Sequence, residues 1–159
     1  MAREVAMSDT PLFDACGVVG VGYEGLDVFQ FIEKLKKDQV SLLVDIRKTP
    51  ISRKPGLSKT RLSENLKAVG IEYKHASCLG NPKWNRPGFS GDPRELEEAR
   101  STYSKLMQNN EAKQWIEWIA EQAMTRTVAL MCFEACEERC HRYVTIREVR
   151  DRIGKLATA

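Results

Sequence analysis

The stretch TVALMCFE (127–134) indicates the fold class of this chain. Its residues from Val128 to Phe133 are all apolar, which favours a short strand buried on both faces. ACGVVGV (15–21) and SLLVDI (41–46) are similar apolar runs, and IEYKH (71–75) follows a glycine. Strands covered on both faces are typical of parallel sheets, so these four runs predict an α/β domain.

Segments with helical spacing of apolar residues separate these runs. Asp92, Pro93 and Glu95 resemble a capped helix start, Ser58 is expected to cap an earlier helix, and Val69 is expected on that helix's buried face. Strands alternating with helices predict a single three-layer α/β/α domain over 14–159 with a mostly parallel sheet, preceded by a flexible tail at 1–13. The expected helices are 26–38, 58–69, 92–124 with a break near 109–110, and one from about residue 140 to the C-terminus.

Composition excludes several classes of protein. The chain has 159 residues, of which 42% are hydrophobic and 30% are charged, and this suits one folded domain. No apolar run approaches the roughly 20 residues that span a bilayer, and we find no signal peptide. Five cysteines without an export signal predict the reducing cytoplasm. The net charge of +3 permits contact with nucleic acid but does not require it.

Polar side chains follow each expected strand. In a parallel sheet these positions share the edge where ligands bind, so we expect one common site there. Asp45 and Arg47 come directly behind an apolar run, and their charges need a partner, which is either each other or an anion held by Arg47. The polar residues at this edge are Tyr23, Asp45, Arg47, Ser52, Arg53, His75, Cys132 and Glu134.

Two loops offer a different kind of surface. The segment 47–61 is rich in Arg and Lys, which suits either a solvated face or a rim that binds phosphate. The segment 84–89 begins with Trp84 and ends with Phe89, and we expect both rings to pack onto the core rather than to stack on a base.

The segment CFEACEERCHR (132–142) carries most of the reactive groups. Cys132 and Glu134 are two apart on an extended segment and therefore share a face. Cys140 and His141 are expected to begin a helix, whose N-terminus favours a thiolate. The helix start gives Cys140 the better environment for a thiolate, whereas Cys132 is better placed to line a pocket with Glu134. The sequence does not decide which of the two cysteines is functional.

Four chemistries compete for this segment. A zinc site would use Cys132, Cys136, Cys140 and His141, but their spacing matches no common zinc motif. A phosphate loop from Cys136 to Arg142 would contain two glutamates and no glycine, which disfavours an anion. A thiol or acid–base site and a purely structural ion network both stay open.

Four segments resemble the family called domain of unknown function 488: VVGVGYEG (18–25), LLVDIRKTPISR (42–53), LKAVGIEYKHASCLG (66–80) and CFEACEERCHR (132–142). The resemblance covers almost the whole chain after the tail. It departs from the family pattern at Asn81, which stands where a second glycine is common, and Cys136 is not part of the pattern. The resemblance supports a fold and a site but implies no reaction. The residues it implicates are Tyr23, Asp45, Arg47, Pro50, Ser52, Cys132, Glu134, Cys140, His141 and Arg142.

We therefore predict an enzyme of unknown reaction class that acts on an anionic substrate such as a phosphate compound, a nucleotide or nucleic acid. Arg47 and Arg142 are expected to bind the anion, with Tyr23, Asp45, Ser52 and Arg53 as further substrate contacts. No cofactor, no metal and no membrane partner is expected, and the oligomeric state, including a homodimer, stays open. The alternative is a non-catalytic module that binds nucleic acid or a nucleotide. The expected catalytic residues are Cys132, Glu134, Cys140 and His141.

Overall fold

The computed structural model describes residues 16–159, so the tail expected at 1–13 lies outside the described part of the chain. Within residues 16–159 the strands form one parallel sheet in the order β1-β4-β2-β3. The predicted parallel sheet is confirmed. Its strands are β1 (Gly17–Gly22), β2 (Val40–Asp45), β3 (Glu72–His75) and β4 (Thr127–Cys132).

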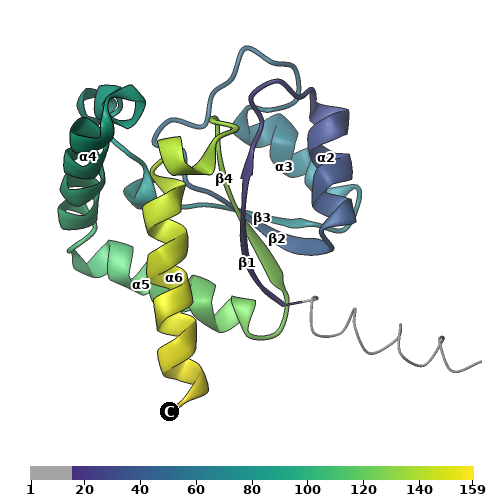
Figure 1. Ribbon diagram of the computed structural model, residues 1–159. Coiled ribbons are helices and arrows are strands. Elements are labelled where there is room, and N and C mark those ends of the chain that lie inside the picture. The colour runs from purple at the N-terminus through teal and green to yellow at the C-terminus, as the bar shows by residue number, and fades with distance from the viewer. Residues whose placement is uncertain (1–15) are drawn as a thin grey trace, which may run out of the picture.

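Helices cover both faces of the sheet, as Figure 1 shows. One face carries α2 (Val28–Lys37) and α3 (Lys59–Lys67). The other carries α5 (Asn110–Ala123) and α6 (Arg142–Ala157), with α4 (Pro93–Leu106) packed into the same core. The predicted three-layer α/β/α domain is therefore confirmed. No helix among residues 16–159 has the length and apolar character needed to cross a membrane.

Alternation along the strands divides the core between the two faces. On β2, Leu42 and Val44 pack with α5 and α6, whereas Leu43 packs with α2 and α3. On β4, Leu130 and Met131 point to opposite faces in the same way. All of β4 is buried because it lies between β1 and β2.

Local signals place the helix starts. Asp92 caps α4 by accepting a hydrogen bond from the Glu95 backbone N–H, as predicted, and Asn109 caps α5 at the expected break. Ser58 precedes α3 but makes no capping hydrogen bond, because its hydroxyl oxygen accepts from the Ser52 backbone N–H instead. Val69 lies beyond α3 and is 42% exposed, so its expected burial is wrong.

The segment 76–91 folds over the core through three short 3-10 turns: Ser77–Leu79, Lys83–Asn85 and Pro87–Ser90. Phe89 packs into the core as predicted. Trp84 does not, since it is 68% exposed and the prediction that it packs inward is wrong.

The chain leaves the sheet in opposite directions around the end of β4. It passes from β1 to α2 and from β2 to α3 on one face, whereas β4 leads to α6 on the other face. Such a divergence opens a crevice at the carboxyl ends of the strands. The fold therefore places residues 132–142 beside a natural binding cleft.

Candidate active site

The carboxyl ends of β1, β2 and β4 face a cavity of about 800 Å³. This volume falls in the range of small-molecule sites. We expected side chains from distant segments to lie together at this edge of the sheet, and some of the predicted site residues do so. The predicted site residues that line the cavity are Tyr23, Arg47, Cys132, Glu134, Cys140 and His141.

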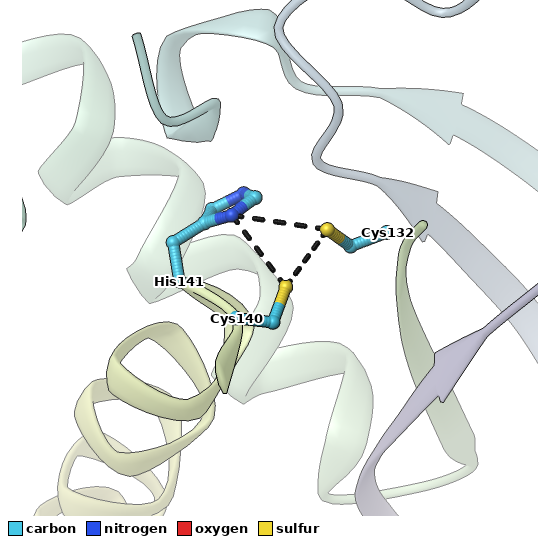
Figure 2. A group of neighbouring side chains, drawn as sticks. All are labelled: Cys132, Cys140 and His141. Atoms are coloured by element: carbon cyan, nitrogen blue, oxygen red, sulfur yellow. Dashed lines mark hydrogen bonds between the residues drawn. The ribbon is translucent and has the colours of Figure 1, made fainter. Parts of the chain in front are cut away.

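Two sulfur atoms and one imidazole nitrogen form a compact group at the wall of the cavity (Figure 2). The Cys140 thiol donates to Cys132 Sγ at 2.8 Å. His141 Nδ1 lies 3.8 Å from Cys132 Sγ and 3.6 Å from Cys140 Sγ. Cys132 ends β4, whereas Cys140 and His141 directly precede α6. The loop between β4 and α6 therefore folds back and places Cys140 and His141 beside Cys132.

The orientation of His141 is set by a backbone contact. Its Nε2 lies 3.0 Å from the carbonyl oxygen of Ile46, which only accepts hydrogen bonds, so Nε2 carries the hydrogen. The other ring nitrogen, Nδ1, is then left to accept a proton from a thiol. The ring also packs edge-on against Tyr103, whose hydroxyl donates to the Leu79 carbonyl.

The two thiols differ in acidity. The hydrogen bond from Cys140 holds the pKa of Cys132 well below its ordinary value, and His141 and Glu134 add to this effect against the opposing effect of burial. Burial and the neighbouring Cys132 raise the pKa of Cys140 well above its ordinary value. The sequence did not decide between the two cysteines, and these opposite pKa shifts distinguish them. Cys140 is extended and precedes α6 rather than opening it.

Glu134 completes the reactive group. Its Oε1 lies 3.0 Å from Cys132 Sγ, and the side chain is half-buried. Burial, together with the adjacent Cys132, raises the pKa of Glu134. A carboxyl group with a raised pKa beside a thiol is suited to proton transfer.

Arg142 holds the loop that presents Glu134 and does not line the cavity formed by the described residues. Its Nη1 donates to the Glu134 carbonyl at 2.7 Å, and its Nη2 donates to the Ala135 carbonyl at 3.3 Å. The guanidinium is 2% exposed. We therefore correct the expectation that Arg142 binds the anion: it is a positioning residue.

Asp45 and Arg47 form the buried ion pair that was one of the two sequence interpretations. Arg47 donates to Asp45 through Nε at 2.9 Å and through Nη2 at 2.7 Å. Tyr73 donates to the same carboxylate at 2.5 Å, and Arg47 Nη1 donates to the Tyr23 hydroxyl at 3.3 Å. Arg47 thus joins this network to the cavity wall, whereas Asp45 is fully buried behind it.

Ser52 and Arg53 lie outside the cavity wall that the described residues form. Ser52 stabilises the loop, because its hydroxyl accepts from the Lys54 backbone and its own backbone N–H donates to Ser58. Arg53 is exposed. Lys54, in the same basic segment 47–61, also stabilises the loop, since its ammonium donates to the Tyr23 and Leu26 carbonyls.

Apart from Lys48, which belongs to the basic segment 47–61, sequence reasoning missed the basic residues that surround the cavity. Arg139 comes from the loop between β4 and α6, where the cysteines drew attention instead, and it donates to the Gly91 carbonyl at 2.7 Å. Asp45 offsets the charge of Arg47, so the other cations set the sign of the cavity. The cavity wall contains two acidic residues, Glu24 and Glu134. The other cations outnumber them and are Lys48, Lys83, Arg86 and Arg139.

Cys132, Cys140 and His141 also form a possible metal-ligand set, because their donor atoms lie within 4.8 Å of one another. Two sulfurs on a tetrahedral zinc ion with Zn–S bonds near 2.3 Å would be about 3.8 Å apart. The two Sγ atoms are 2.8 Å apart, so a zinc ion would have to separate them. The group therefore fits a zinc ion only after the two sulfurs move apart by about 1 Å.

Residues 27–149 match the family model described as "Domain of unknown function DUF488". The match spans the strands β2, β3 and β4 and the segment 132–142, and it confirms the family resemblance found in the sequence. No curated protein and no solved structure matches the chain.

Proposed function

Since this chain belongs to the DUF488 family, which is a domain of unknown function, we propose its function from the site: it is an enzyme that uses Cys132 as a nucleophile on an anionic substrate. One observation carries the proposal. Cys132 Sγ lies 2.8 Å from a thiol donor and 3.0 Å from a carboxyl oxygen, at the wall of a cavity large enough for an organic substrate. The reducing cytoplasm stays the predicted compartment, because the nucleophile must be kept reduced.

The neighbouring groups support complementary roles. Cys132 supplies the attacking thiolate, because its pKa is lowered by Cys140. Glu134, whose pKa is raised, donates a proton to the leaving group. His141 Nδ1 accepts a proton from either thiol, since Nε2 is engaged by Ile46.

The charge around the cavity supports an anionic substrate. Besides Arg47, four cationic side chains line the cavity and outnumber its acidic ones. They are Lys48, Lys83, Arg86 and Arg139. A concave surface of one sign attracts ligands of the opposite sign and raises their rate of encounter.

Alkylation with iodoacetamide across pH 5–9 tests the nucleophile, with the modified cysteine identified by peptide mass spectrometry. We expect Cys132 to react well below pH 8, where an ordinary cysteine with a pKa of about 8.5 is mostly protonated. Cys136, which is exposed, is the internal control, and at pH 6 it should be modified more slowly than Cys132. Equal, slow modification of Cys132 and Cys136 at pH 6 would contradict the proposal.

Binding of nucleic acid without catalysis stays a second candidate, favoured by Trp84. This ring is 68% exposed, and it lies next to Lys83 and close in sequence to Arg86. Exposed aromatic rings among cations are platforms for unpaired bases. Retention of the protein on single-stranded DNA that falls with salt, and that Trp84→Ala weakens, would favour this function. Retention that Trp84→Ala leaves unchanged would count against it.

A further inference from the structure

We propose that Cys132 and Cys140 form a two-electron redox pair that reduces small acidic disulfides and becomes an internal disulfide in the process. This inference rests on the proposed role of Cys132 as a nucleophile and names the substrate class for the same cavity. It assigns to Cys140 the role of resolving cysteine, which a simple nucleophilic enzyme does not need.

The distance between the sulfurs carries the inference. Their separation of 2.8 Å exceeds the length of a disulfide bond by about 0.8 Å. The two side chains are 5% and 2% exposed, so a bound disulfide reaches them only through the cavity that both line. The cysteines are joined by the loop 133–139, and a side-chain movement of less than about 1 Å brings their sulfurs into bonding distance.

The first step forms a mixed disulfide. The Cys132 thiolate attacks one sulfur of the substrate R–S–S–R, a bond forms between Cys132 Sγ and that sulfur, and the S–S bond of the substrate breaks. Glu134, 3.0 Å from Cys132 Sγ, gives its proton to the departing sulfur, which leaves as R–SH. The difference in acidity between the two thiols supports this order, because the cysteine with the lowered pKa attacks first.

The second step closes the internal disulfide. His141 Nδ1, 3.6 Å from Cys140 Sγ, takes the proton from Cys140. The resulting thiolate attacks Cys132 Sγ, the Cys132–Cys140 bond forms, and the second sulfur of the substrate leaves and recovers the proton from His141. In total the protein dithiol loses two electrons, the substrate disulfide gains two, and two R–SH molecules are released.

The cavity indicates which disulfides are preferred. Four cations besides Arg47 line it, so a disulfide that carries carboxylates should be favoured over a neutral or cationic one. Oxidised glutathione is a suitable anionic probe, and 2-hydroxyethyl disulfide and cystamine are the neutral and cationic comparisons. We expect the anionic probe to react about tenfold faster than the neutral one at low salt, and the difference to shrink as salt is added.

The experiment mixes fully reduced, full-length protein with each probe and follows the products by intact mass and peptide mapping. Wild-type protein should lose two hydrogen atoms and gain a Cys132–Cys140 crosslink. Cys140→Ser should instead accumulate one glutathione on Cys132, and Cys132→Ser should leave Cys140 reduced. Cys136→Ser should still form the crosslink, because Cys136 lies in the same loop but outside the pair.

The outcomes separate this inference from the proposed function. A wild-type protein that keeps a stable glutathione on Cys132, with Cys140 reduced, overturns the redox pair and leaves the nucleophile intact. A wild-type protein whose Cys132 resists both glutathione and iodoacetamide overturns both. Stoichiometric zinc that blocks both thiols until a chelator removes it also overturns both. The wild-type readout does not depend on whether either serine variant folds.

Discussion

His141 Nε2 lies 3.0 Å from the carbonyl oxygen of Ile46, and this contact joins the start of α6 to the residue that follows β2. It orients the ring so that Nδ1 faces both sulfurs. A single backbone acceptor thereby assigns the two nitrogens of the imidazole to different tasks, one structural and one chemical.

Replacing His141 with glutamine should therefore slow the alkylation of Cys132 at pH 7 by about tenfold or more, because the thiol loses its proton acceptor. The rate is measured by mass spectrometry with iodoacetamide. His75→Gln is the matched control: His75 follows the same sheet edge, contacts the Arg47 carbonyl and lies outside the described cavity wall, so the rate should stay near that of wild type. Equal losses in both variants would indicate a general loss of folding.

The variant Glu134→Gln should slow proton donation to the leaving group but should not slow the attack by Cys132. Iodide leaves without a proton, and the glutamine amide can still donate a hydrogen bond to Cys132 Sγ, so alkylation of Cys132 by iodoacetamide should change little. An alkyl disulfide, whose leaving sulfur needs a proton, should react about 10²-fold more slowly than with wild type. Because burial raises the pKa of Glu134, the wild-type rate with the alkyl disulfide should fall as pH rises through that pKa, and the variant should lack this fall.

A disulfide that releases an acidic aromatic thiol provides the control for Glu134→Gln. Its leaving group departs as a thiolate, so wild type and variant should react with it at similar rates. If the variant slows the aromatic and the alkyl disulfide equally, Glu134 positions the thiol and does not act as a general acid.

Arg47→Met should destabilise the fold by about 3–5 kcal/mol, because it leaves the carboxylate of Asp45 buried without its partner. The free energy of unfolding is measured by urea titration. Arg94→Met is the matched control, since Arg94 pairs with Glu98 at 77% and 65% exposure and such pairs contribute less than about 1 kcal/mol. A loss below 1 kcal/mol for Arg47→Met would show that Tyr73 and the backbone N–H of residue 47 satisfy the buried carboxylate.

Gly22→Ala should damage both stability and thiol reactivity. Gly22 ends β1 beside Cys132, and a methyl group there would overlap the backbone carbonyl of Glu134. The loop must shift, at a cost of about 1–3 kcal/mol, and Glu134 moves with it. Gly154→Ala is the opposite case: it lies in α6 with open space around it, so it should stabilise the protein by about 0.5–1 kcal/mol. Urea titration and Cys132 alkylation measure both effects.

The strands and the edge of the site could be predicted from the sequence because both depend on local patterns. Apolar runs of strand length separated by helical spacing predict a covered parallel sheet, and parallel strands bring their carboxyl ends together. Cys132 and Glu134 were therefore expected beside Arg47, and the cavity contains all three. The capping residue Asp92 works over three residues, which is why the start of α4 was also predictable; near 109–110 the sequence predicted a break, and Asn109 caps α5 there.

Long-range packing decided what the sequence left open. The strand order, the exposure of Trp84 and the use of Arg142 to hold the loop carbonyls depend on contacts between segments far apart in the chain. So does the acidity of the thiols, because the pKa of a cysteine follows its neighbours and its burial rather than its place in a motif. The sequence alone determined that Arg47, Cys132 and Glu134 reach the same edge of the sheet. The tertiary structure decided that Cys132 is the acidic thiol, because only folding brings the Cys140 thiol and the His141 ring against it.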